Sequence, residues 1–326
     1  MSVVFSTYPW AYFTPGGGEF QIEKLFNAIN KKDFIIERYN QWNPQKDVKI
    51  HHFFSCIGGS YHFCNYLKEE GKKLVISPSL WITKDTANQY AIEEIRSQLL
   101  LADLLVVNSE IEKITLSEVL SISIDKFKVV NNGFDSELAD FKNDEFPLIK
   151  ELPASWRNNY FYCLGNIEQR KNQNILIEAA KLLGFNLVLA GHIRQKNYYE
   201  KLRIKDYSNI KYLGPIEHNS YKYRSLFKNA KAFILPSTLE TPGLAALEAA
   251  AFGLPIIVTK EGSAKEYFGD IKTYFDGKKA DISELCELIN LINKSPEKGI
   301  VKEDIISQYN WNKIAEDQIN IYKKLI

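Results

Sequence analysis

Two acidic residues, Glu240 and Glu248, lie in the part of the chain whose residue types say most about chemistry. Residues 236–259 predict the end of a strand, a loop that carries Glu240, and a helix that starts at Gly243, carries Glu248 and ends at Gly253. A carboxylate in the loop and another about one and a half turns into the helix can face the same bound molecule. Because ionised carboxylates only accept hydrogen bonds, the pair suits a ligand rich in hydroxyl groups, such as a ribose or a hexose.

The start of this helix lies between the two acids and is suited to a phosphate group. The first backbone N–H groups of a helix have no partner inside it, and the positive end of the helix dipole is there. The residues Thr241, Pro242 and Gly243 fit such a start, because proline is tolerated in the first turn and glycine permits close approach to the backbone.

A structural interpretation of both acids is also open, with Glu240 as a helix-cap residue and Glu248 as a solvated helix residue. Glu248 argues against it, because it is the only charged residue in the segment LAALEAAAFGLP, residues 244–255. An unpaired acid on a helix suited to burial is costly, so we expect Glu248 to have a partner or a ligand.

Short apolar runs alternate with segments of helical period along the whole chain, which predicts repeated βα units and parallel sheets. In the first half, strands are expected at residues 3–6, 50–54, 74–77, 104–108 and 127–131, and helices at residues 19–30, 61–70, 88–102 and 109–120. In the second half, strands are expected at residues 160–164, 187–190, 210–213, 232–235 and 256–259, and helices at residues 174–183, 198–205, 221–229 and 243–252. The periodicity is lost over residues 141–159, so a domain boundary is expected near residue 150.

The predicted fold class is therefore α/β, with two doubly wound, Rossmann-like domains at residues 1–150 and 151–311. Such sheets bind ligands at the carboxyl ends of their strands, and two of them joined by one linker are expected to form a cleft. Glu240 follows the strand expected at residues 232–235, so the site is expected in loops of the second domain.

The composition excludes several classes of protein. The 41 basic residues nearly balance the 40 acidic ones, which argues against a nucleic-acid partner because such binding needs a concentrated basic field. No apolar run approaches the roughly 20 residues that span a bilayer, so we expect a cytoplasmic protein and leave attachment to the inner face of the membrane open. The four cysteines lack the close spacing of a zinc site: Cys56, Cys64, Cys163 and Cys286.

Residues 236–255 resemble the E-x7-E motif of retaining glycosyltransferases with the GT-B fold, specifically family 4. Glu240 and Glu248 have the spacing of that motif. The resemblance implies that Glu240 contacts the hydroxyls of the donor sugar, that Glu248 holds the nucleotide ribose, and that the backbone at Gly243 and Leu244 meets phosphate and sugar.

A second segment, residues 163–172, is similar to the loop with which this family holds the donor diphosphate. Arg170 and Lys171 fall at the matching positions, so the resemblance implies that they bind the diphosphate and act in catalysis together with Glu240. An enzyme without a metal must neutralise a departing diphosphate with cations and helix dipoles, which two adjacent cations can do. The chain departs from the pattern at Asn166, where many members have an arginine.

Gly16 and Gly17 follow the first expected strand and resemble the glycine pair of the family's first domain, which approaches the donor or the acceptor. By itself a glycine cluster indicates only a turn. Residues 102–110, 129–135 and 309–311 also resemble family landmarks, and the last helix, at about residues 312–326, is expected to pack back on the first domain. The chain has no histidine at residues 75–81, where many members have one that orients the donor, and we assign no histidine a catalytic role.

The resemblance implies a metal-independent retaining hexosyltransferase that moves a sugar from a UDP- or GDP-linked donor to a hydroxyl of a glycan or lipid-linked acceptor. No cofactor is expected, and the pathways that it suggests are surface polysaccharide, lipopolysaccharide or glycoprotein biosynthesis. A catalytically silent protein that binds nucleotide sugars on the same fold is the alternative. A nicotinamide oxidoreductase is disfavoured, because no G-x-G-x-x-G follows an expected strand.

Overall fold

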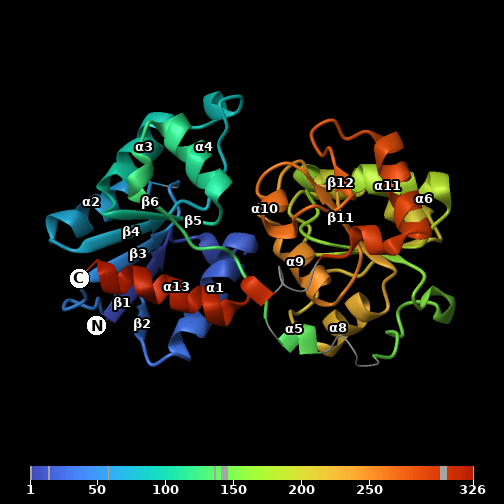
Figure 1. Cartoon of the computed structure of the whole chain (residues 1–326), viewed down its shortest axis with the longest axis horizontal. Helices are drawn as coiled ribbons and strands as arrows, with labels where there is room; N and C mark the ends of the chain where they lie inside the picture. The colour runs from blue at the N-terminus through green and yellow to red at the C-terminus, as the bar shows by residue number, and fades with distance from the viewer. Residues whose placement is uncertain are drawn as a thin grey trace. The chain divides into compact units, whose positions relative to one another are not determined.

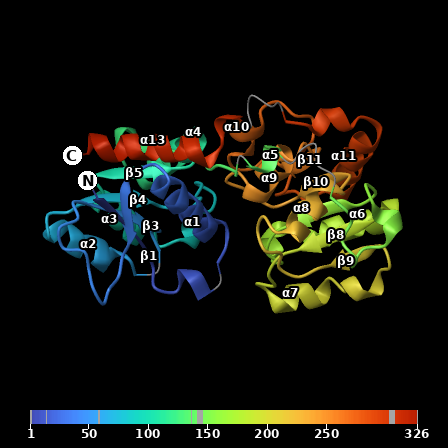
Figure 2. The same cartoon turned by 90° about the horizontal axis from the view of Figure 1, so that it is seen from below.

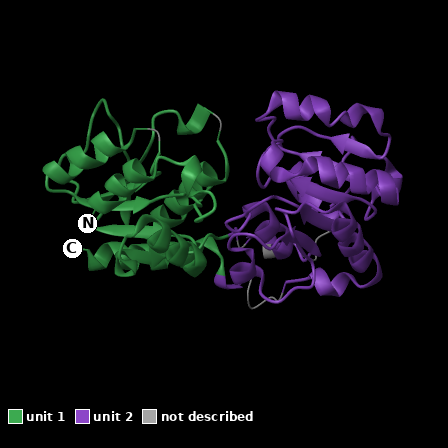
Figure 3. Cartoon of the chain, turned by 90° about the horizontal axis from the view of Figure 1, so that it is seen from above, with its two compact units in different colours: residues 1–133, 309–326 green, residues 134–308 purple. Residues whose placement is uncertain are grey.

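The computed structural model describes residues 2–13, 15–57, 59–135, 137–140, 146–301 and 307–325. It forms two compact units, coloured separately in Figure 3. The first unit extends to Gly133 and also includes the C-terminal residues from Tyr309, and the second begins at Phe134 and ends at Gln308. Each unit is built around its own parallel sheet.

The sheet of the first unit has six parallel strands in the order β2-β1-β3-β4-β5-β6. Its strands are β1 (Ser2–Thr7), β2 (Ile35–Arg38), β3 (Ile50–Phe54), β4 (Lys73–Ser77), β5 (Leu104–Val107) and β6 (Phe127–Val129). Its helices are α1 (Gly17–Asn30), α2 (Tyr61–Glu69), α3 (Ile92–Leu101), α4 (Glu110–Leu120) and α13 (Trp311–Lys324). The central strands are rich in Val, Ile, Leu and Phe because helices cover both faces of a parallel sheet.

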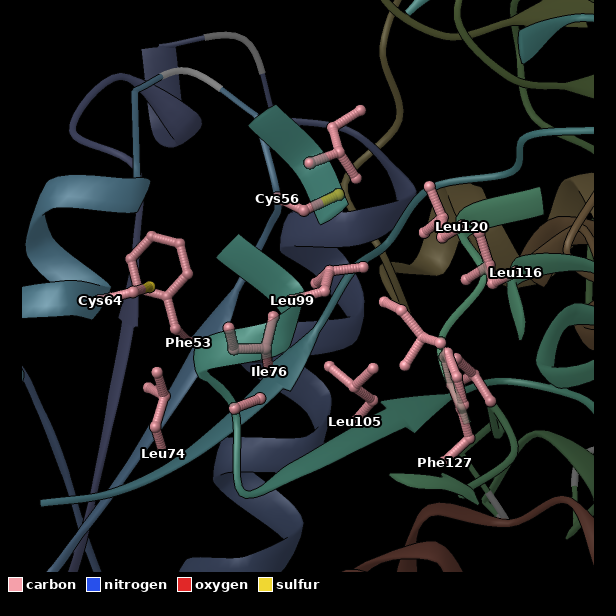
Figure 4. Packing of buried hydrophobic residues seen from close by; sticks show 14 of the residues in the cluster. Phe53, Cys56, Cys64, Leu74, Ile76, Leu99, Leu105, Leu116, Leu120 and Phe127 are labelled. Carbon is pink, nitrogen blue, oxygen red and sulfur yellow. The ribbon is translucent and has the colours of Figure 1, made fainter. Parts of the chain in front are cut away.

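The core on one face of this sheet joins strands to helices (Figure 4). Leu105 on β5 and Phe127 on β6 are fully buried, and Leu116 of α4 belongs to the same apolar cluster. Burial of such side chains contributes about 1.5–3 kcal/mol each, which fixes α4 on the sheet.

The last helix, α13, returns to the first unit and lies along α1 (Figure 1). His52 of β3 is buried there, with Nδ1 2.5 Å from Tyr322 Oη of α13 and Nε2 2.8 Å from Ser77 Oγ of β4. Gly133 also meets this end of the chain, since a Cβ at Gly133 would lie 2.9 Å from the Tyr309 carbonyl oxygen. The segments at residues 129–135 and 309–311 are therefore neighbours, and glycine is required for their close approach.

The sheet of the second unit has six parallel strands in the order β12-β11-β10-β7-β8-β9. Its strands are β7 (Phe161–Leu164), β8 (Leu187–Ala190), β9 (Ile210–Tyr212), β10 (Ala232–Leu235), β11 (Ile256–Thr259) and β12 (Tyr274–Phe275). Its helices include α5 (Glu137–Asp140), α6 (Gln173–Leu183), α7 (Lys196–Lys201), α8 (Tyr221–Lys228), α9 (Leu244–Ala251), α10 (Ala264–Phe268) and α11 (Ile282–Lys294) (Figure 2).

The predicted α/β class with two doubly wound sheets is confirmed. The sequence pattern did not predict β2 and β12. The first is a short edge strand that ends in two charged residues, and the second has only two residues. The helix expected at residues 88–102 begins only at Ile92, after a 3₁₀ turn, and the one expected at residues 198–205 is α7 followed by a second 3₁₀ turn.

The connection between the units includes residues 141–145, which lie outside the described part of the chain. From residue 146 onward the connection packs on α8 of the second unit. The carbonyl of Phe146 accepts a hydrogen bond from Asn229 Nδ2 at 2.8 Å, and the carbonyl of Pro147 accepts one from Ser225 Oγ at 2.7 Å. These contacts place the end of the connection in the second unit, and α5 near its start contacts α9, so the second unit begins at Phe134, before the boundary expected near residue 150.

Within the described ranges, no helix combines the length and the apolar character needed to span a bilayer.

Candidate functional site

The strand order of the second sheet reverses between β7 and β10, which are hydrogen-bonded neighbours. From β7 the chain continues outward through β8 and β9, and from β10 it continues in the opposite direction through β11 and β12. In doubly wound folds, ligands bind at the carboxyl ends of the strands beside such a reversal. The loops that follow β7 and β10 carry Arg170, Lys171 and Glu240, so the topology brings these three residues to one edge of the sheet.

Lys171 and Glu240 form a direct ion pair between Nζ and Oε1. Arg170 Nη1 lies 3.8 Å from the same carboxylate oxygen, and Glu240 is 7 % exposed. Burial alone would raise the pKa of Glu240, but the charges of Lys171 and then Arg170 outweigh it and hold the pKa below its ordinary value. The carboxylate therefore remains ionised at neutral pH and accepts hydrogen bonds from hydroxyl groups.

Backbone and side-chain hydrogen bonds join the two loops. The carbonyl of Arg170 accepts a hydrogen bond from the backbone N–H of Thr238 at 2.8 Å, and Arg170 Nη1 donates to the carbonyl of Leu239 at 2.9 Å. Asn172 Nδ2 donates to the carbonyl of Pro236 at 2.9 Å. The cations and the carboxylate are thus held in place by the fold as well as by their mutual attraction.

Glu168, which the sequence analysis did not single out, belongs to the same charged group. Its Oε1 lies 3.1 Å from Arg170 Nη2 and its Oε2 lies 3.4 Å from Arg194 Nη1. Glu168 is 7 % exposed, so this buried acid is paired with two arginines whose side chains are themselves exposed. A signal was available in its position two residues before Arg170, but acids beside basic residues are too common in sequences to single it out.

Gly243 allows the chain to turn from the Glu240 loop into α9. It has a φ of 91°, and a Cβ there would lie 3.0 Å from Leu235 Cδ2 and 3.3 Å from Glu240 Cγ. Because this backbone conformation is not helical, α9 begins at Leu244, one residue after the start expected at Gly243. Leu244 is the first residue of the helix, where backbone N–H groups are available to an anion.

Glu248 is 5 % exposed on α9 and has protein partners for both carboxylate oxygens. His218 Nε2 lies 2.7 Å from Oε1, and Tyr223 Oη donates a hydrogen bond to Oε2. Burial, followed by the charge of Glu248, raises the pKa of Tyr223 well above its ordinary value, so the phenol stays protonated and keeps donating. The sequence led us to expect a partner for Glu248, but nothing in the pattern identified His218 or Tyr223 as that partner.

Gly16 and Gly17 belong to the first unit, where they start α1 after β1. Gly16 is the N-cap residue, and its N–H already donates to Glu19 Oε2 at 2.7 Å. Gly17 is the first helical residue, and a Cβ there would meet no atom within 4 Å. Within the first unit, the backbone at Gly17 is therefore open to close approach, whereas the N–H of Gly16 has a partner.

Comparison with known proteins adds the family and the relatives. The family model described as glycosyl transferases group 1 matches residues 146–308, half of the chain. O-antigen chain mannosyltransferase B of Escherichia coli is 23 % identical over 323 residues, which cover 93 % of this chain and 83 % of that protein. An uncharacterised glycosyltransferase of Methanocaldococcus jannaschii is 26 % identical over 222 residues, and the match spans only 54 % of that relative's length.

Among solved structures, the Anabaena protein HepE in complex with UDP and glucose is similar over 99 % of both chains. The TM-score is 0.77 and the sequence identity is 15 %, so the likeness shows a shared fold.

Proposed function

Because the chain belongs to the glycosyl transferases group 1 family and has the GT-B fold, we propose that it is a retaining glycosyltransferase of family 4. It transfers a hexose from a nucleotide-diphosphate sugar to a hydroxyl group of a glycan or lipid-linked acceptor. The observation that carries this proposal is the buried, ionised Glu240 beside Lys171 and Arg170, at the edge where the order of the second sheet reverses.

The donor lies on the second unit in this proposal. Glu240 accepts hydrogen bonds from the sugar hydroxyls and Glu248 accepts them from the ribose, each worth about 1.5–3 kcal/mol. The backbone at Gly243 and Leu244 meets the phosphate. UDP- and GDP-linked sugars are the candidates, and the complex of the similar HepE with UDP and glucose supports a donor of this kind.

The chemical step breaks the bond between the anomeric carbon and the leaving phosphate oxygen, and forms a bond to the acceptor oxygen on the same face. Negative charge grows on the diphosphate as the first bond breaks. Lys171, Arg170 and the start of α9 therefore stabilise the transition state more than the ground state. The leaving phosphate oxygen takes the acceptor proton, so the step needs no protein base.

Metal independence is part of this proposal and rests on the same two cations, which supply the charge that a divalent ion would otherwise supply. Within the described ranges, His, Cys, Asp and Glu side chains do not form a group of three that could hold a metal ion. Transfer should therefore continue unchanged in excess EDTA.

The acceptor is proposed to belong to surface polysaccharide, lipopolysaccharide or glycoprotein biosynthesis. The similarity to an O-antigen mannosyltransferase over 93 % of this chain supports that choice.

The decisive experiment starts with a thermal-shift panel of UDP- and GDP-sugars, because a ligand that binds the native state raises its melting temperature. The stabilising donor is then incubated with hydroxyl acceptors, and NMR gives the anomeric configuration of the product. Retention of the donor configuration supports the proposal, and inversion contradicts it. Binding without transfer or donor hydrolysis would instead support the catalytically silent alternative.

A further inference from the structure

A hollow of about 790 Å³ with both polar and apolar lining lies in the second unit, at the loops that follow β7 and β8. Its walls come from the start of α6 and the 3₁₀ turn before it, from α7 and its N-cap residue Gln195, and from Ala280; α6 and α7 are labelled in Figure 2. Its volume falls within the range of about 300–1,000 Å³ that is usual for small-molecule sites. We call it the α6–α7 hollow.

Half of the residues that line the α6–α7 hollow have amide side chains. Five of its ten residues are asparagine or glutamine: Gln169, Asn172, Asn174, Gln195 and Asn197. An amide offers a donor and an acceptor side by side, which matches neighbouring hydroxyl groups on a sugar ring. The lining also includes the aromatic ring of Tyr198 and the apolar side chain of Ile175, which can pack against the C–H face of a sugar.

The charged residues of the lining are all basic. Lys196 and Lys201 both line the hollow, and neither forms an ion pair with any residue in the described ranges. No aspartate or glutamate is among the ten lining residues. A site with two ammonium groups and no carboxylate favours a ligand that carries a negative charge.

Hydrogen bonds hold part of this lining in position before any ligand binds. Tyr198 Oη donates to Asn174 Oδ1 at 2.9 Å and accepts from the backbone N–H of Asn174 at 3.0 Å. Gln195 Oε1 accepts from the backbone N–H of Gln169 at 2.7 Å. Each of these pairs bridges the start of α6 and the start of α7, so the opposite walls are already joined.

We propose that the α6–α7 hollow is a second saccharide-binding site, which takes a sugar or oligosaccharide bearing a carboxylate or phosphate group. This inference goes beyond the proposed function, because binding there requires no transfer reaction. Arg170, Lys171, Glu240 and Glu248 are absent from the lining of the hollow, which shares with the proposed donor site only the supporting residue Asn172.

The test is a set of calorimetric titrations of the full chain with four probes. Hyaluronan tetrasaccharide carries carboxylates, glucose 6-phosphate carries a phosphate, maltotetraose is neutral and inorganic phosphate has no sugar. At least one acidic saccharide should bind about tenfold or more tightly than maltotetraose and than inorganic phosphate. Absence of binding by both acidic saccharides, or equal binding of the neutral or sugar-free probe, overturns the proposal.

Two variants locate the binding. Changing both Lys196→Gln and Lys201→Gln should weaken the acidic saccharide about tenfold or more, whereas the matched control Lys205→Gln with Lys211→Gln, exposed lysines outside the lining, should not. Asn174→Asp keeps an acceptor for Tyr198 and adds a negative charge, so it should also weaken binding. Unchanged affinity in both hollow variants overturns the proposal.

A competition experiment separates the hollow from the donor site. UDP and GDP are added before the titration with the acidic saccharide. Unchanged saccharide affinity supports two separate sites. Displacement of the saccharide by either nucleotide would place it in the donor site and overturn the proposal. Because this binding is measured without acceptor or turnover, failure of the transferase assay leaves its result intact.

Discussion

The two units have the same architecture but differ in what their buried polar groups contact. In the first unit, His52, one of two buried histidines on β3, is neutral and contacts the hydroxyl groups of Tyr322 and Ser77, and the buried carboxylate of Glu112 accepts a hydrogen bond from the backbone N–H of Asn108. In the second unit, buried carboxylates contact cations or strong donors, as Glu240 does with Lys171. In both units the parallel sheet brings loops together at the carboxyl ends of its strands. The residue types on those loops then decide which ligands can bind there.

Energetics explain why the charged groups are the better functional candidates. Burying two opposite charges is often no more stabilising than packing apolar residues in the same volume. The neutral contacts of His52 are the kind that a fold uses to join elements, here α13 to the sheet. The concentration of buried charge in the loops after β7 and β10 therefore points to ligand chemistry in the second unit.

The largest effect is expected from Lys171→Ala in the second unit. It removes the cation that contacts Glu240 and that we propose stabilises the departing diphosphate, so turnover should fall about a hundredfold or more. Steady-state kinetics with the matched control Lys211→Ala, an exposed lysine on β9, provide the measurement. Thermal unfolding is recorded alongside, since loss of the ion pair also leaves Glu240 less well compensated. Full activity in Lys171→Ala would contradict the site assignment.

The second largest effect is expected on nucleotide binding when Glu248 is changed. Glu248→Ala should weaken nucleotide binding about tenfold to a hundredfold, because a charge-assisted hydrogen bond to the ribose is lost. Glu248→Gln keeps the side-chain volume and should give a smaller loss, which guards against a folding defect in the alanine variant. Isothermal titration with UDP and GDP measures both, with Glu178→Gln on the exposed face of α6 as the control. If all variants bind UDP and GDP with equal affinity, Glu248 does not contact the nucleotide.

Acid should destabilise the two units in different pH ranges. Burial lowers the pKa of His52 to about 3, and burial followed by the charge of Lys72 lowers that of His51 to about 4. Below the ordinary value of 6.5 the unfolded chain therefore binds protons at these two histidines that the folded chain does not. The contribution of His52 to the free energy of unfolding is complete above pH 6.5 and falls by about 1.4 kcal/mol per pH unit toward pH 3. The pKa of Glu240 is lowered from 4.5, so its contribution is lost only below pH 4.5.

Hydrogen exchange of the full chain between pH 6.5 and 4.5 measures this difference. The amides of the first unit should lose protection first, after correction for the intrinsic exchange rate. His52→Gln should reduce that pH dependence and the double change His51→Gln with His52→Gln should reduce it further, whereas His62→Gln, at an exposed position on α2, should leave it unchanged. Earlier loss of protection in the second unit would show that the neutral histidine does not control acid stability.

A smaller effect is expected at His218. His218→Phe removes the N–H that contacts Glu248 and should weaken nucleotide affinity about fivefold, because Tyr223 alone then orients the carboxylate. His218→Gln retains a donor and should restore most of the affinity. The Kd of the nucleotide should change more than the turnover number at saturating donor. If both variants have a lower melting temperature but an unchanged nucleotide affinity, His218 has only a structural role.

The smallest effect is expected at the first unit's glycine pair. Gly17→Ala meets no neighbour within 4 Å, so the free energy of unfolding should stay within about 0.5–1 kcal/mol of the original and should rise if it changes. Donor binding on the second unit should be unchanged. A rise in the KM of the acceptor or donor would show that a ligand lies against this backbone. Thermal unfolding and steady-state kinetics together distinguish these results.

Much of the fold follows from local patterns in the sequence. The strands expected at residues 50–54, 187–190, 232–235 and 256–259 coincide with β3, β8, β10 and β11, because short runs of apolar residues between turns can be buried on both faces. The start of α9 was misplaced by one residue, since a backbone conformation such as that of Gly243 is set by the packing around Leu235 and Glu240.

The sequence by itself determined the α/β class, the position of Glu240 after a strand, and the burial of Glu248 on an otherwise uncharged helix. Only the tertiary structure decided which groups these acids contact. Glu240 meets Lys171 because β7 and β10 are neighbours in the sheet, and Glu248 meets His218 and Tyr223 because α8 packs near α9. Spacing along the chain sets which face of an element a residue occupies, whereas contacts between residues 25 to 69 positions apart depend on how the strands are ordered.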